Sequence, residues 1–70
     1  MKALTKFPKR LRAIREMRGL SVRVAARIIG ISPSTLQRWE SGISSPSLEK
    51  ITRSAERLNC TITELIGAEP

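Results

Sequence analysis

The sequence predicts a small all-α protein, and three observations support this prediction. Apolar residues recur at intervals of three and four along most of the 70-residue chain, which is the spacing of one helix face. Glycine, proline and asparagine residues divide the chain into five segments of helical length. No segment alternates apolar and polar residues as a half-buried strand would. We therefore expect a compact domain of five short helices around a single core.

The first helix is expected from about Lys9 to Arg18, after an N-terminal arm over residues 1–8. Pro8 suits a helix start and Gly19 suits a left-handed helix end. The inward stripe of this helix is predicted to contain Leu11, Ile14 and Met17. The folded domain is accordingly expected over residues 9–67.

A second helix is expected between Ser21, a suitable N-cap, and Gly30, which suits a left-handed helix end. Its predicted core positions are Ala25, Ala26 and Ile29. The next helix begins only a few residues after Gly30. Two helices joined by a tight turn containing glycine form a helix-turn-helix, here over about residues 21–41.

The third helix is expected over residues 33–41, between the N-cap Ser32 and a left-handed stop at Gly42. One face at helical spacing holds Leu36, Trp39 and Glu40. The other face is polar and consists of Ser34, Gln37, Arg38 and Ser41. A short polar face with an arginine at its centre suits hydrogen bonding to base edges in the major groove of DNA.

The fourth helix is expected from Ser47 to about Leu58, with Asn59 as its stop. Its predicted inward residues are Leu48, Ile51, Ala55 and Leu58. Thr61 and Glu64 have the spacing of a capping box that opens a fifth helix over residues 62–66. The apolar side chains of this last helix cannot all face one core, so it is the predicted dimer interface, through Ile62, Leu65 and Ile66.

The charge of the chain is concentrated in the half that contains the helix-turn-helix. The formal net charge is +7, and residues 1–38 hold ten Lys and Arg against the single acid Glu16. Residues 39–70 have a balance of −2. A positive half of this kind indicates a polyanionic partner, with double-stranded DNA favoured by the helix-turn-helix. A basic surface that serves only solubility is the alternative.

The residue inventory argues against an enzyme. The chain contains no His, Asp or Tyr, and its six Glu are scattered along the predicted helices. We expect no metal site and no cofactor, because no cluster of metal-ligating residues is visible. One cysteine, Cys60, cannot form an internal disulfide, and no apolar run has the length of a membrane span or a signal peptide. These features predict a cytoplasmic protein without a membrane partner.

The order of these residues resembles the Cro-repressor or XRE family of helix-turn-helix proteins over about residues 9–67. The matching residues are Arg15, Arg18-Gly19-Leu20-Ser21, Ala25-Ala26, Gly30-Ile31-Ser32, Leu36, Trp39-Glu40-Ser41-Gly42, Pro46-Ser47-Leu48-Glu49, Ala55 and Leu58. The resemblance implies a lambda-repressor-like fold of five helices. It also implies a bacterial or phage transcription regulator, a repressor by expectation, that binds operator DNA as a homodimer with its third helix in the major groove.

The resemblance assigns roles to individual residues. Bases are expected to be contacted by Pro33, Ser34 and Arg38, to which the polar face adds Gln37. Phosphates are expected to be contacted by Ser21, Ser41 and Ser44. The positive charges of Arg10, Arg23 and Arg27, which the resemblance does not itself imply, are expected to add attraction to phosphates. Arg15 and Glu40 fall on positions that often form a structural ion pair between the first and third helices.

The chain departs from the family pattern at several positions of its second and third helices, including Arg23 and Arg27, where acids or Lys are commoner. Val22 stands where the family usually has a glutamine that contacts the DNA backbone, and Pro33 has no amide donor. Val24 and Ile28 are apolar at positions that are usually polar. They either pack beneath Leu4 and Phe7 of the N-terminal arm or form a surface for a protein partner.

Three other functions compete with the DNA-binding regulator. A protein-interaction module, such as an antitoxin or anti-regulator with secondary DNA binding, is supported only by the apolar pair Val24 and Ile28. A MerR or excisionase-like domain shares the pattern of residues 32–40, but no basic β-wing follows Gly42. RNA binding has little support, since only Phe7 and Trp39 could stack on bases.

Overall fold

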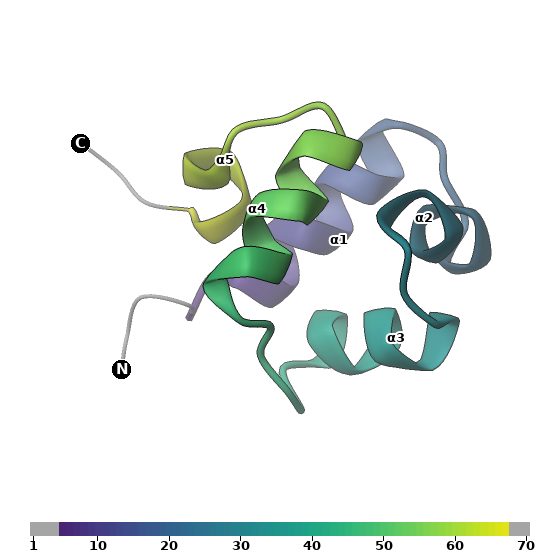
Figure 1. Ribbon diagram of the computed structural model, residues 1–70, viewed down its shortest axis with the longest axis horizontal. Coiled ribbons are helices and arrows are strands. Elements are labelled where there is room, and N and C mark those ends of the chain that lie inside the picture. Colours follow the sequence, from purple (N-terminus) through teal and green to yellow (C-terminus); the bar gives the residue numbers. More distant parts are fainter. Residues whose placement is uncertain (1–4, 68–70) are drawn as a thin grey trace.

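The computed structural model describes residues 5–67, which form five α-helices joined by short turns (Figure 1). The helices are α1 (Phe7–Met17), α2 (Val22–Ile29), α3 (Pro33–Ser41), α4 (Leu48–Arg57) and α5 (Ile62–Ile66). Helix α1 packs against both α3 and α5, while α2 packs against α3 and α4. No strand occurs between residues 5 and 67, so the all-α prediction is confirmed.

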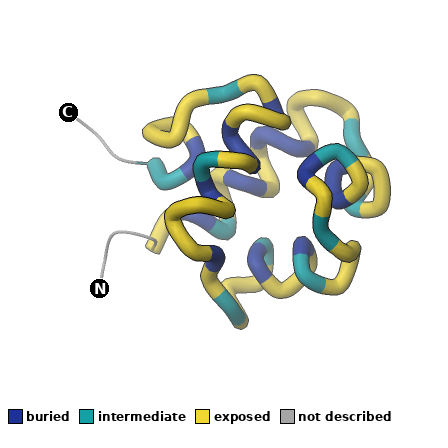
Figure 2. Tube along the Cα trace, viewed as in Figure 1, coloured by how far each residue is buried: buried dark blue, intermediate teal, exposed yellow. Residues whose placement is uncertain are grey.

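Every helix contributes at least one side chain to a single apolar core. The buried apolar residues are Phe7, Leu11, Ile14, Ala25, Ala26, Ile29, Leu36, Trp39, Ile51, Ala55, Leu58 and Leu65. Figure 2 shows that the buried positions face the interior of the helix assembly and that the outer turns are exposed. The rings of Phe7 and Trp39 meet edge to face, with centroids 6.3 Å apart, a geometry that aromatic pairs prefer. The start of α1 is thereby packed against α3.

Helix α1 begins two residues earlier than predicted and ends one residue earlier. It starts at Phe7, whose side chain is only 1% exposed, so Phe7 belongs to the core and not to an N-terminal arm. Proline is tolerated throughout the first turn of a helix, and Pro8 therefore could not identify the first residue. Met17, predicted to face inward, is 78% exposed because it lies well off the stripe formed by Phe7, Leu11 and Ile14.

Helices α4 and α5 lie where the sequence predicted them, but the predicted exposure of two leucines, Leu48 and Leu65, is wrong. Helix α4 begins at Leu48 after the cap residue Ser47, and Leu48 is 72% exposed because the core does not extend to this first turn. Leu65 is fully buried, so its side chain has no surface to offer to a second subunit. Of the other two predicted interface residues, Ile62 is exposed and Ile66 packs partly against the core.

Candidate DNA-binding surface

The two helices of the helix-turn-helix have closely similar ends. The hydroxyl of Ser21 accepts a hydrogen bond from the amide of Val24, and that of Ser32 accepts one from Thr35, both at 3.1 Å. These bonds satisfy amides that a helix start leaves unpaired. Gly30 and Gly42 end the helices with φ of 91° and 78°, which glycine adopts without a Cβ clash. The predicted caps and stops are confirmed.

Helix α3 buries its apolar face and leaves its polar face to solvent. Leu36 is fully buried and Trp39 is 3% exposed. The exposed residues are Pro33, Ser34, Gln37, Arg38 and Ser41. Figure 2 shows exposed positions along the lower edge of the molecule, where α3 lies in Figure 1. The four residues predicted to contact bases therefore lie together on an accessible helix surface.

A bidentate ion pair joins α1 to α3. The guanidinium of Arg15 donates from Nε to Glu40 Oε2 at 2.7 Å and from Nη2 to Glu40 Oε1 at 3.0 Å. A third bond runs from Arg15 Nη1 to the carbonyl of Leu20 at 2.8 Å. The structural ion pair implied by the family resemblance is thus present, and it links α3 to the turn that precedes α2.

This ion pair is largely removed from water. The side chains of Arg15 and Glu40 are 11% and 9% exposed. The hydrogen bonds with Glu40 raise the pKa of Arg15, against the opposing effect of burial. An exposed pair on the outer face of α1, between Arg12 and Glu16, has side chains that are 64% and 56% exposed. Fixed planar geometry and burial give the first pair a structural role that the second cannot have.

The residues predicted to contact phosphates fall into two groups. Ser21, Arg23, Arg27 and Ser41 are exposed on the helix-turn-helix, and Ser44 lies half-buried in the loop after α3. The backbone amides of Ile43 and Ser44 both donate to the carbonyl of Arg38, at 3.0 and 3.4 Å, which orders this loop beside α3. Arg10 lies apart from them, because its Nε donates to the carbonyl of Glu64 in α5 at 2.8 Å.

Two arginines have structural contacts that the sequence did not indicate. Arg18 donates to the carbonyl of Asn59 at 2.9 Å, and Arg57 donates to the carbonyl of Ile28 at 3.0 Å. Each joins elements far apart in sequence by satisfying a carbonyl near a helix end. The loop residue Ile43 was also missed. It is 71% exposed in the loop directly after α3, and no motif in the sequence singled it out.

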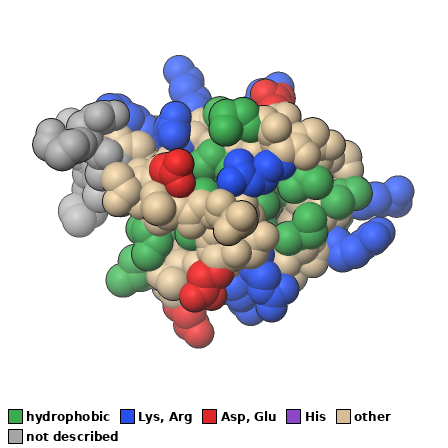
Figure 3. Space-filling model, turned by 90° about the horizontal axis from the view of Figure 1, so that it is seen from above, with side chains coloured by type: hydrophobic (Ala, Val, Ile, Leu, Met, Phe, Trp, Pro, Cys, Tyr) green, Lys and Arg blue, Asp and Glu red, His purple; other side chains and the backbone are tan. Residues whose placement is uncertain are grey.

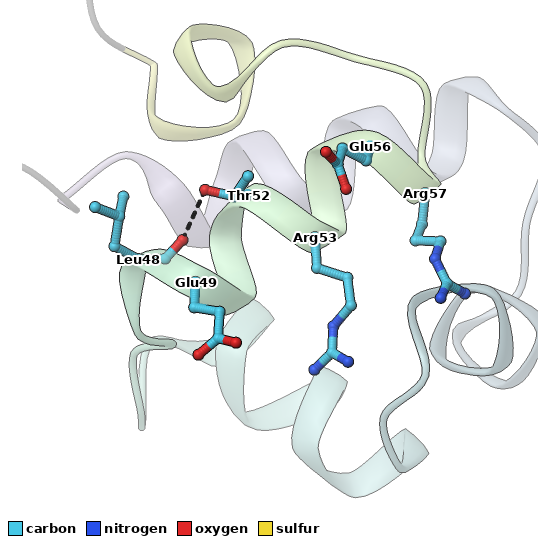
Figure 4. A pocket seen from close by; sticks show the side chains of 6 residues that line it. All are labelled: Leu48, Glu49, Thr52, Arg53, Glu56 and Arg57. Atoms are coloured by element: carbon cyan, nitrogen blue, oxygen red, sulfur yellow. Dashed lines mark hydrogen bonds between the residues drawn. The ribbon is translucent and has the colours of Figure 1, made fainter.

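An open hollow of about 550 Å³ lies along α4 (Figure 4). It is lined by Leu48, Glu49, Thr52, Arg53, Glu56 and Arg57, all from one helix. Its carboxylates and guanidinium groups form no ion pair among residues 5–67 and surround no enclosed volume. The hollow therefore lacks the convergent polar groups of an active site or a small-molecule site.

Within residues 5–67, no group of three or more metal-ligating side chains could hold a metal ion. No helix in the same part of the chain is long and apolar enough to cross a membrane.

The short capped helices, the tight turn and the exposed polar face of α3 define a helix-turn-helix protein. The chain belongs to the helix-turn-helix family HTH_3, whose model matches residues 11–65. This is an XRE-type helix-turn-helix family, so the family resemblance drawn from the sequence is confirmed. It is a family of DNA-binding regulators and not an enzyme family.

Curated relatives support this assignment. The chain is 37% identical over 60 residues to the HTH-type transcriptional regulator AnsR of Bacillus subtilis, covering 86% of this chain and 52% of AnsR. It is 33% identical over 61 residues to the antitoxin PezA of Streptococcus pneumoniae, covering 87% of this chain and 39% of PezA. The chain thus spans about half of the first relative and less of the second.

A solved structure shows the same fold. The crystal structure of an HTH_3 family transcriptional regulator from Vibrio cholerae superposes with a TM-score of 0.84 and 26% sequence identity. The match covers 93% of this chain and 36% of that chain. The helix arrangement described above therefore also occurs as part of that longer chain.

Proposed function

We propose that this chain is a sequence-specific DNA-binding transcriptional regulator that contacts operator bases with α3. The observation that supports this most directly is the exposed face of α3, where Ser34, Gln37 and Arg38 lie together. Leu36, Trp39 and the Arg15–Glu40 pair hold the opposite face against α1. Such a surface presents hydrogen-bond donors and acceptors to base edges on a fixed support.

Affinity and specificity are assigned to different side chains. Arg38 is proposed to bind guanine O6 and N7, the most common specific arginine contact in the major groove. Arg23 and Arg27 are proposed to neutralise phosphates, with Ser21, Ser41 and Ser44 as hydrogen-bond donors to the backbone. Binding then falls with salt, with a log–log slope of roughly −0.9 for each phosphate neutralised.

We further propose that the protein binds as a homodimer and represses by occupying its operator. A single domain of this size contacts few base pairs, and two subunits double the site. With Leu65 buried, the exposed Ile62 is the proposed centre of the α5 interface. Half-sites are then expected about ten base pairs apart.

Selection from a random double-stranded DNA pool tests this function. The purified protein is incubated with the pool at near-physiological salt, and the recovered sequences are compared after several rounds. We expect an inverted repeat with half-sites about ten base pairs apart. Recovery of one half-site without a repeat would refute the dimer, and failure to enrich any sequence would refute specific DNA recognition by α3.

Binding to another protein is a second proposed function. The similarity to the antitoxin PezA favours it, and the apolar residues of α2 supply a candidate surface. Both functions can reside in one chain, because the base-contacting face of α3 and the apolar pair of α2 consist of different side chains. Arg23 and Arg27 border the apolar pair and are also assigned to phosphates, so the two partners would share these two arginines.

A further inference from the structure

The outer face of α2 carries an apolar pair that the fold leaves accessible. Helix α2 turns Ala25, Ala26 and Ile29 into the core. Val24 and Ile28, four residues apart, share a flank of α2 outside this buried set, where Val24 is 38% exposed and Ile28 is partly exposed. Phe7, expected from the sequence to cover this pair, is buried against Trp39 instead. Leu4, the other expected cover, lies outside the described residues.

Positive charge borders this apolar pair on two sides. Arg23 and Arg27 are exposed on α2 itself, which contains no acidic residue. Arg57 reaches across from α4, and its Nη1 donates to the carbonyl of Ile28 at 3.0 Å. Figure 4 shows Arg57 extending from α4 toward α2. Among residues 5–67 the ion pairs are Arg12–Glu16 and Arg15–Glu40, so none of these three guanidinium groups is paired with a carboxylate.

The space-filling view (Figure 3) shows hydrophobic and basic side chains beside one another on this part of the molecule. In Figure 3, hydrophobic side chains on the right of the molecule, where α2 lies, are bordered by Lys and Arg side chains, and the acidic side chains visible lie elsewhere. DNA phosphates could pair with these arginines but would leave the methyl groups of Val24 and Ile28 in water. A partner that covers the whole surface needs both carboxylates and apolar side chains.

We propose that Val24 and Ile28, bordered by Arg23, Arg27 and Arg57, form a docking surface for an acidic amphipathic helix of another protein. Apolar side chains of that helix at positions i and i+4 pack on Val24 and Ile28, as in helix-in-groove recognition. Glutamates or aspartates beside them pair with the arginines, whose remaining N–H groups are free to donate. This inference rests on the second proposed function and not on DNA binding by α3.

Selection from a displayed library of helical peptides tests the proposal. The library randomises exposed positions of a 16-residue helix, and the protein is the bait at near-physiological salt. We expect enriched peptides to carry apolar residues at i and i+4 flanked by Glu or Asp. Their affinity is expected to fall about tenfold or more against Val24→Ser, because this variant loses a large part of the apolar surface that the peptide would bury. Met17→Ser, which removes an apolar side chain from α1 that is even more exposed than Val24 (78% against 38%), is the control and should change nothing.

Exchanging the charges of Arg27 and the peptide distinguishes specific binding at this site from non-specific attraction between opposite charges. Arg27→Glu is expected to weaken the enriched peptides, and replacing their acidic residues by lysine should restore binding to this variant alone. Peptides without an acidic pattern, or peptides that bind Val24→Ser and the wild type equally, would overturn the proposal. Because the peptide selection contains no DNA, its failure would leave the operator selection unaffected, and each function is tested separately.

Discussion

Helices α2 and α3 share one construction and differ on their outer faces. Each begins after a capping serine and ends at a left-handed glycine, and each buries its inward residues in the same core. The outer face of α3 is polar with one arginine, whereas α2 combines two arginines with two apolar side chains. Similar local rules therefore produce two surfaces with different chemistry. The first suits base edges, and the second suits a partner with apolar groups.

The largest expected effect on stability comes from breaking the buried ion pair that attaches α3 to α1. Glu40→Ala leaves the guanidinium of Arg15 without its partner, and the free energy of unfolding is expected to fall by about 3 kcal/mol. For a domain of this size, that lowers the melting temperature by more than about 10 °C. Thermal denaturation followed by circular dichroism measures this shift.

The exposed pair on α1 is the matched control for this experiment. Glu16→Ala removes the Arg12–Glu16 contact, whose side chains are more than half exposed. Its expected cost is below about 1 kcal/mol, because exposed pairs gain little over hydration. Equal effects of Glu40→Ala and Glu16→Ala would show that burial gives the Arg15–Glu40 pair no special role.

The arginines of the two outer faces are expected to differ in their effect on DNA binding. Arg38→Ala on α3 should cost about 1–3 kcal/mol on the selected operator and relax the preference at one base pair. Arg27→Ala on α2 should weaken all sequences alike and reduce the salt slope by about one. Competition assays with single-base operator variants measure both. If Arg38→Ala and Arg27→Ala had the same sequence-independent effect, α3 would not be the helix that contacts bases.

The capping serines test whether the ends of the two helices are equivalent. Ser32→Ala and Ser21→Ala each remove one side-chain cap, and each is expected to cost about 1 kcal/mol of stability. The corresponding glycine variants should cost only a few tenths of a kcal/mol, because glycine is acceptable at an N-cap. Chemical denaturation of the four variants measures these differences. A loss confined to one helix would break the equivalence drawn above.

Local signals in the sequence were sufficient for most of the fold. Ser32 and Gly42 predicted the bounds of α3 correctly because N-caps and left-handed stops depend on neighbouring backbone alone. Leu48 was placed wrongly because it lies in the first turn of α4, which the core does not reach, and Met17 because it lies off the inward stripe of α1. The start of α1 was missed because the burial of Phe7 depends on its distant contact with Trp39.

The candidate site was predicted only in part, because spacing within a helix gives its exposed face but not its contacts with distant residues. The exposed face of α3 follows from helical spacing, which leaves Ser34, Gln37 and Arg38 on one side. The Arg15–Glu40 pair joins residues 25 positions apart, and spacing within one helix carries no information about it. Only the family resemblance indicated that pair. The role of Arg57 at Ile28 had no signal at all, because any arginine near a helix end can reach a carbonyl.

The cap of α5 differs from those of α2 and α3 because it includes a carboxylate. The backbone amide of Thr61 donates to Glu64 Oε1 at 2.8 Å, and the Glu64 amide donates to the Thr61 hydroxyl at 3.0 Å. The hydrogen bond from the Thr61 backbone lowers the pKa of Glu64 below its ordinary value of 4.5. A carboxyl group whose pKa is lowered by folding stabilises the protein above its unfolded pKa, and this contribution is lost as pH falls through the folded pKa.

The smallest expected effect is therefore a pH-dependent one. Glu64→Gln keeps an acceptor for the Thr61 amide but removes the charge. At pH 7 the wild type should be slightly more stable than this variant, and the difference should shrink below about pH 4.5 and vanish once the pH lies below the lowered pKa of Glu64. Denaturation of both proteins across this range measures the difference in their free energies of unfolding. The titration of the other glutamates affects both proteins alike and largely cancels in this difference. Ser21→Ala and Ser32→Ala should show no such convergence, because a serine hydroxyl does not titrate. A difference that stayed constant from pH 7 to pH 3 would mean that the Glu64 charge adds nothing to its cap.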